Sequence, residues 1–117
     1  MNYLLVFIGG GLGSVLRFAL TNLLGSSAFI WATWTANILA ACVIGLLVGL
    51  GVRENQPPYW LLLAVGFCGG LSTFSTFSLE TLQLIKQDSW MLLAFQVLST
   101  VIVSVGAVYL FTQISQK

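Results

Sequence analysis

Charged residues are scarce in this chain: they make up 6% of its 117 residues, and histidine is absent. A soluble domain carries about 25% charged residues, because its surface must be solvated. Since 58% of the residues are hydrophobic, the composition indicates an integral membrane protein. The net charge of +1 gives no basic surface for nucleic acid. Without histidine, a Cys-x-x-Cys motif or clustered carboxylates, the sequence offers no transition-metal ligand set and predicts no enzyme.

The first hydrophobic segment could be mistaken for a signal peptide, since Ser26-Ser27-Ala28 has the small residues of a cleavage site. No positive charge precedes this segment, Arg17 interrupts it, and further hydrophobic segments follow. Signal peptides show the opposite pattern. The sequence therefore predicts that residues 3–24 form a retained membrane helix.

Four segments reach the length of about 20 apolar residues that a helix needs to cross a bilayer. They are residues 3–24, 29–52, 59–85 and 90–112. Pro57-Pro58 cannot lie inside a helix and places the start of the third segment at about Tyr59. The short connections leave no room for an extramembrane domain. The prediction is one all-α transmembrane domain of four helices spanning residues 1–117.

Positive charges are balanced between the two sides of the predicted membrane domain. Arg53 and Lys117 fall on one side, and Lys86 and Arg17 fall on or near the other. The positive-inside rule then has little to act on. Two arrangements remain open: dual topology with antiparallel pairing, or an N-in, C-in protein with a weak bias.

The third segment contains the most unusual stretch, residues 66–78, where Gly69-Gly70 stands beside five Ser and Thr residues. Such a stretch favours a break in the helix near the bilayer midplane. The freed carbonyls would have to be satisfied by protein or by a bound cation. The alternative is that Gly66 and Gly70 permit close helix packing and that the hydroxyls bond back to their own helix.

Other polar and aromatic residues could line an anion path with this stretch. Phe74 and Phe77 share a helical face among hydroxyls, and the edge of an aromatic ring is electropositive. Asn37 could donate two hydrogen bonds to an anion. Two phenylalanines at this spacing usually serve core packing, and an interhelical hydrogen bond would explain Asn37 equally well. A polar stripe on the fourth helix is formed by Gln96, Thr100 and Ser104.

Two ionisable residues fall inside the predicted spans. Arg17 could draw anions to a pore mouth or extend to the membrane surface. Glu80 could pair with a basic partner or cap the broken helix, and the sequence does not choose between these roles.

Residues 69–78 together with Glu80 closely resemble the third-helix signature of the Fluc/CrcB family of fluoride channels. The segment Gly9-Gly10-Gly11-Leu12-Gly13-Ser14-Val15-Leu16-Arg17-Phe18 resembles that family's first-helix motif. Thr33 followed by Asn37 and later Gly45 is similar to its second-helix pattern. The similarity extends over the whole chain in length, helix count and motif order.

The resemblance implies an antiparallel dual-topology homodimer in a bacterial-type inner membrane, with two pores at the subunit interface that export fluoride passively. The implied pore residues are Asn37, Phe74, Phe77, Ser75, Thr76, Thr33, Thr100 and Ser104. Arg17 is predicted to lie at the pore mouth, because its charge would draw anions from water. The resemblance also implies a structural Na⁺ held by the backbone carbonyls of Gly69 and Ser72.

This chain departs from the family pattern at a few positions. Ser72-Thr73 stands where two threonines are usual, Ala40 where glycine is common, and Gln96 where a tyrosine can occur. Two other functions remain as alternatives. A small multidrug-type four-helix transporter should carry a carboxylate in its first helix, where this chain has Arg17. An accessory subunit of a heterodimeric channel would not depend on Phe74.

Overall fold

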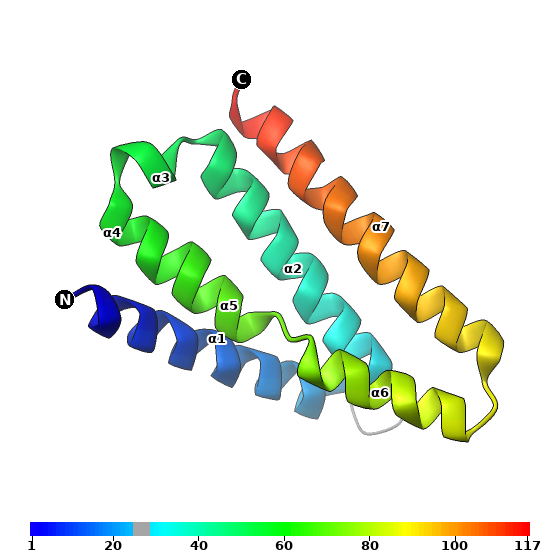
Figure 1. Ribbon diagram of the computed structural model, residues 1–117. Coiled ribbons are helices and arrows are strands. Elements are labelled where there is room, and N and C mark those ends of the chain that lie inside the picture. Colours follow the sequence, from blue (N-terminus) through cyan, green and yellow to red (C-terminus); the bar gives the residue numbers. More distant parts are fainter. Residues whose placement is uncertain (25–28) are drawn as a thin grey trace.

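The computed structural model describes residues 1–24 and 29–117, so the predicted connection of residues 25–28 lies outside the described residues. The described chain is almost entirely helical (Figure 1). Its elements are α1 (Asn2–Leu24), α2 (Phe29–Gly49), α3 (Val52–Asn55), α4 (Pro57–Trp60), η2 (Leu61–Cys68), α5 (Gly69–Leu71), α6 (Ser75–Lys86) and α7 (Trp90–Ser115).

Four helical stretches of the described chain are long and apolar enough to cross a membrane. They are Asn2–Leu24, Ile30–Gly49, Pro57–Lys86 and Trp90–Ser115. The prediction of an all-helical protein with four candidate membrane spans is therefore confirmed.

Three helix boundaries in the structure differ by a few residues from the approximate predicted ones. The second helix ends at Gly49 rather than at residue 52, because Gly51 adopts a left-handed conformation (φ 66°) that glycine tolerates and that ends a helix. The third begins at Pro57 rather than Tyr59, since proline fits the first helical position. The fourth continues to Ser115 instead of ending at residue 112.

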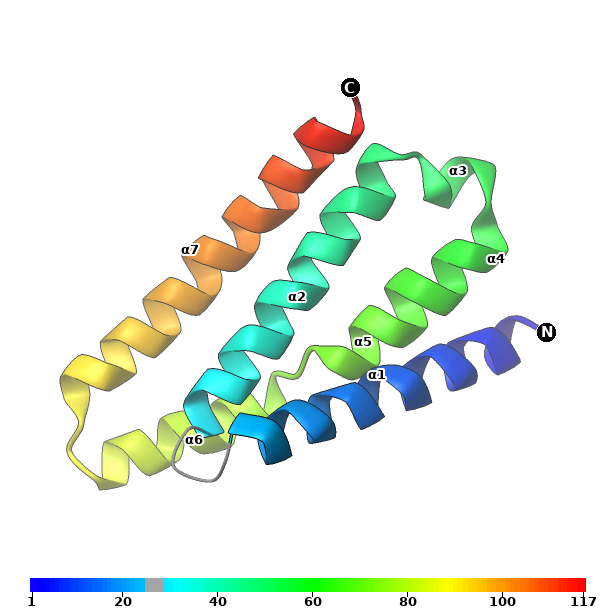
Figure 2. The same cartoon turned by 180° about the vertical axis from the view of Figure 1, so that it is seen from behind.

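The third span changes its backbone conformation along its length. After α4, the segment η2 is a π-helix of 8 residues, in which hydrogen bonds join each residue to the fifth one along. The short α5 ends at Leu71, because Ser72 is extended (φ −78°, ψ 151°). Helical structure resumes at Ser75. Figure 2 shows the chain leaving the helical path between α5 and α6.

Helix α1 packs directly against η2 and α5, beside which it lies in both views (Figures 1 and 2). Its glycines permit this contact. A Cβ atom on Gly13 would lie 2.7 Å from the Leu71 amide nitrogen, and one on Gly66 would lie 3.0 Å from the Gly9 Cα atom. Gly70 meets the backbone of Gly10 in the same way. Gly66 and Gly70 therefore do serve close packing, as the alternative interpretation of this stretch predicted.

Helix α2 packs along α7 and also contacts the other spans. A Cβ on Gly45 would lie 2.7 Å from the Val108 carbonyl oxygen, so these two helices also approach closely. At the crossing of α2 with the third span lies the buried core of Ala36, Ala40, Cys68 and Leu71. Most large apolar side chains outside this core are exposed, as expected where lipid or another subunit covers them.

Candidate functional site: a polar groove beside the interrupted third span

The interruption between α5 and α6 is held by the side chain of Asn37 from α2. The Thr73 amide donates to Asn37 Oδ1 (2.9 Å), and Asn37 Nδ2 donates to the Thr73 carbonyl (3.5 Å). The side-chain amide of Asn37 thus replaces the helical partners of both backbone groups of Thr73, its N–H and its C=O. Thr73 also caps the start of α6, because its Oγ1 accepts a hydrogen bond from the Thr76 amide (3.3 Å).

The hydrogen bonds that the amides of Thr73 and Thr76 donate to side chains leave two carbonyls without their helical partners. In a continuous α-helix the amide of Thr73 would bond to the carbonyl of Gly69, and the amide of Thr76 to that of Ser72. Both amides instead donate to side-chain oxygens. The carbonyls of Gly69 and Ser72 therefore lack the hydrogen bonds that a continuous α-helix would give them.

The neighbouring carbonyls have partners of their own. The Cys68 carbonyl accepts hydrogen bonds from the amide of Ser72 (2.9 Å) and from its hydroxyl (2.7 Å). The Gly70 carbonyl accepts one from Arg17 Nε (3.1 Å). Arg17 thus places a cationic group at the carboxyl end of α5, where the helix dipole is negative.

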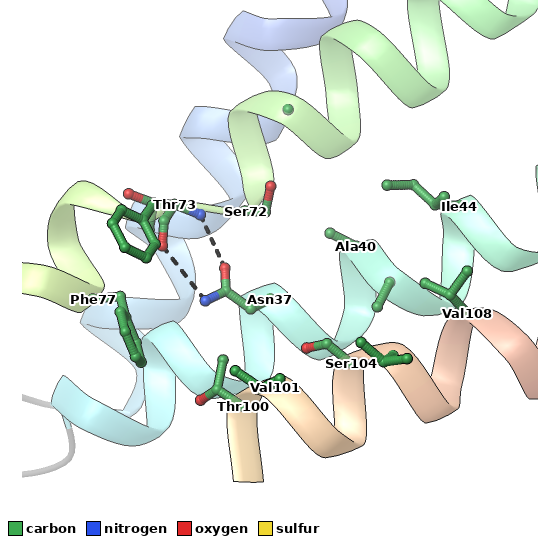
Figure 3. A pocket seen from close by; sticks show the side chains of 14 residues that line it. Asn37, Ala40, Ile44, Ser72, Thr73, Phe77, Thr100, Val101, Ser104 and Val108 are labelled. Atoms are coloured by element: carbon green, nitrogen blue, oxygen red, sulfur yellow. Dashed lines mark hydrogen bonds between the residues drawn. The ribbon is translucent and has the colours of Figure 1, made fainter. Parts of the chain in front are cut away.

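A groove of about 620 Å³ runs between this interruption and α7. Figure 3 shows Asn37 turned toward Thr73, with Phe77 on one side of it and Ser104 on the other. Five predicted pore residues line the groove, namely Asn37, Phe74, Phe77, Thr100 and Ser104. Gly69 and Ser72, predicted to offer carbonyls, line it as well. The remaining lining residues are Ala40, Ala41, Ile44, Thr73, Val101, Val105 and Val108.

The two phenylalanines lie at the end of the groove where α6 begins. Their ring centroids are 5.7 Å apart, and the ring planes meet at 32°. Phe74 is 78% exposed, whereas Phe77 is half-buried. A largely exposed aromatic ring within a membrane-spanning segment is available to a second subunit or to a ligand.

The other predicted site residues lie outside the lining of this groove. Ser75 and Thr76 are in the first turn of α6, where the Ser75 hydroxyl lies 3.2 Å from the hydroxyl of Thr73. Arg17 contacts the Gly70 carbonyl from α1. Thr33 is buried and donates to Glu80 Oε1.

Sequence reasoning left open whether Glu80 pairs with a basic partner or caps the broken helix, and the structure brings it together with the uncharged side chains of Thr33 and Gln96. Gln96 Nε2 donates to Glu80 Oε2 (2.9 Å), and all three side chains are buried. Nothing in helical spacing links these residues, because they come from α6, α2 and α7. The only signal was that each is a polar residue within an apolar span.

The groove offers hydroxyl and amide donors and aromatic rings. Among the described residues, no three His, Cys, Asp or Glu side chains form a group that could hold a metal ion. None of the lining side chains carries a formal charge. Such a site can bind a small anion through hydrogen bonds while allowing its release, which conduction requires.

The structure thus defines a multi-pass helical membrane protein whose third span is interrupted beside a polar groove. The family sequence model described as "CrcB-like protein, Camphor Resistance (CrcB)" matches residues 4–112. The chain belongs to this CrcB-like family.

Curated relatives share much of their length with this chain. A protein of Phocaeicola vulgatus is 40% identical over 111 residues, which cover 92% of each chain. One of Ruegeria pomeroyi is 49% identical over 90 residues, covering 76% of this chain and 70% of the relative. One of Magnetococcus marinus is 41% identical over 110 residues, covering 90% and 89%. All three bear the name fluoride-specific ion channel FluC.

Proposed function

We propose that this protein is a fluoride-selective channel that lets F⁻ leave the cell passively across a bacterial inner membrane. The names of the relatives support this function. The observation that carries it is the convergence of Asn37, Phe77, Thr100 and Ser104, from three different spans, on one groove without a formally charged lining.

The groove would lower the cost of removing water from the anion. Hydroxyl and amide groups donate hydrogen bonds that replace those of water, and aromatic edges are electropositive. Hydrogen fluoride is a weak acid that enters cells as a neutral molecule and releases F⁻ at the higher internal pH. A passive path for the anion then suffices for export, and no nucleotide-binding motif is present in the sequence.

The pore is completed in this proposal by a second copy of the chain inserted in the opposite orientation. Phe74 would then belong to the pore wall together with the groove of the partner. The even distribution of positive charge supports dual topology. The exposed apolar side chains of α7, such as Val101 and Val105, are suited to a helix–helix interface in lipid.

A structural Na⁺ fits the backbone at the interruption. The carbonyls of Gly69 and Ser72 have lost their helical partners to side chains, and carbonyl oxygens are the ligands that Na⁺ takes in membrane proteins. When bound, the ion would supply positive charge between two subunits without using a charged side chain. The hydrogen bonds between Asn37 and Thr73 fix the backbone that carries the Gly69 and Ser72 carbonyls.

The remaining predicted site residues have supporting roles in this proposal. Arg17 attracts anions toward the pore mouth while its Nε atom holds the Gly70 carbonyl. Ser75 and Thr76 offer hydroxyls on the approach to the phenylalanines. Thr33 acts through its hydrogen bond to Glu80.

Fluoride efflux from liposomes that contain the purified protein tests the proposal, with chloride efflux as the ion control. Fluoride without chloride release is expected, and Phe77→Ile is expected to slow it. The matched control is Phe18→Ile, because Phe18 is 67% exposed on α1, away from the groove. No fluoride release from folded protein would overturn the proposal for the chain alone and direct the test to a heterodimer with a related chain. Proton-coupled efflux of organic cations would instead identify a multidrug-type transporter.

A further inference from the structure

Helix α6, whose first turns carry the phenylalanine pair, has little buried surface of its own. Of its described residues from Ser75 to Lys86, only Glu80 and Leu84 are buried. The extended backbone at Ser72 separates it from α5, so no continuous helical ladder fixes its rotation. The contacts of Glu80 and Leu84 are therefore the main constraint on the rotation of α6 about its axis.

Glu80 contacts two other spans through its carboxyl group. Oε1 accepts a hydrogen bond from Thr33 Oγ1 (2.5 Å) on α2, and Oε2 accepts one from Gln96 Nε2 (2.9 Å) on α7. The exposed fractions are 3% for Glu80, 4% for Thr33 and 1% for Gln96. Both donors are uncharged, so this buried group depends on two directional hydrogen bonds rather than on an ion pair.

Phe77 precedes Glu80 by three residues, so the two side chains are neighbours on one side of α6. Phe77 lines the groove, whereas Glu80 does not. A rotation of α6 that broke the hydrogen bonds of Glu80 would also turn the ring of Phe77 away from its place. The orientation of the Phe77 ring is therefore coupled to the hydrogen bonds of the Glu80 carboxyl group.

We propose that Glu80 is a positioning residue: clamped between Thr33 and Gln96, its carboxyl group fixes the rotation of α6 and so the direction in which Phe77 faces the groove. This inference rests on the proposed fluoride channel function. Glu80 acts through Phe77 and does not contact the conducted ion. Gln96 is the donor on α7 that matches this carboxyl group.

An exchange of the two side chains provides the test. Gln96→Glu alone places two carboxyl groups together and removes one donor. In Glu80→Gln/Gln96→Glu, the new glutamine can donate to the new glutamate and still accept from Thr33. The bond between positions 80 and 96 is then reversed, and the bond from Thr33 keeps its direction. Single-channel fluoride conductance is the readout, because it is independent of the amount of folded protein. The ratio of fluoride to chloride conductance is measured on the same channels.

We expect Gln96→Glu to lower fluoride conductance about tenfold, the size that the loss of one buried hydrogen bond can produce. The double variant should recover conductance and selectivity to within about twofold of wild type. Gln83→Glu is the matched control, since Gln83 is exposed on α6, and it should conduct like wild type.

The outcomes separate the inference from the function on which it rests. Wild-type protein that carries no fluoride current would overturn the channel proposal. If wild type conducts but Gln96→Glu is unchanged, or if the folded double variant stays impaired, the positioning role is wrong. Should Gln96→Glu not fold, the double variant alone decides, because it keeps a hydrogen bond from Thr33 to residue 80 and one between residues 80 and 96.

Discussion

The backbone contact between α1 and the third span makes a sharp prediction about one methyl group. Gly13→Ala places a Cβ atom against the Phe67 carbonyl oxygen and 2.7 Å from the Leu71 amide nitrogen, where ordinary contacts begin at 3.4 Å. Both neighbours are backbone atoms and cannot turn aside as a side chain could. Gly11→Ala on the same helix is the control, because its Cβ would meet nothing within 4 Å.

The comparison between these two variants isolates the steric term. Each substitution gains about 1 kcal/mol from the higher helix propensity of alanine, so this gain cancels in the difference. Overpacking of a close contact costs about 1–3 kcal/mol. Gly13→Ala should therefore be less stable than Gly11→Ala by about that amount, while Gly11→Ala should equal or exceed wild type.

Thermal unfolding of the purified protein in detergent gives the stability order, and fluoride efflux from liposomes gives the functional effect. We expect Gly13→Ala to unfold at a lower temperature than both wild type and Gly11→Ala, and to release fluoride more slowly because α1 carries Arg17 to the interruption. Equal unfolding temperatures for the two variants would refute the backbone-to-backbone packing of α1.

Three further predictions concern the interruption and the turn after α2. Asn37→Leu leaves the peptide groups of Thr73 without their side-chain partner, so it should cost about 1–3 kcal/mol of thermal stability and abolish fluoride efflux; unchanged efflux would contradict the role of Asn37. Arg17→Met removes the partner of the Gly70 carbonyl and should slow efflux more than Arg17→Lys, which keeps the positive charge. Wild-type efflux rates in both variants would show that Arg17 neither attracts anions nor holds the Gly70 carbonyl. Gly51→Ala forces alanine into a left-handed conformation (φ 66°) and should lower stability by about 1 kcal/mol without changing efflux, as melting and efflux of the same preparation would show.

Helix number and the approximate spans could be predicted from the sequence, because a bilayer requires long apolar segments and these leave a strong pattern. The ends were less predictable. Gly51 ends α2 through its backbone conformation, which is a local choice that hydrophobicity does not record. The π-helical geometry of η2 has no compositional signal in an apolar run such as Leu61–Cys68.

The groove was partly predictable because its polar residues recur at helical spacing within apolar spans. Thr100 and Ser104 fall one turn apart on α7 and both line it. Thr33 shares a face of α2 with Asn37 by the same rule, yet its hydroxyl bonds to Glu80 instead. Spacing tells which residues share a face of one helix, but it does not tell which other helix covers that face.

The pairing of the spans has a consequence for biosynthesis. The tight glycine contacts join α1 to η2 and α5, and α2 to α7, so neither close pair consists of spans made one after the other. The glycines of α1 have no partner until the third span has been made, and those of α2 none until the last. These glycine contacts therefore cannot stabilise a newly made hairpin of the first two spans. The close packing of this fold is therefore completed only after the third and fourth spans have been made.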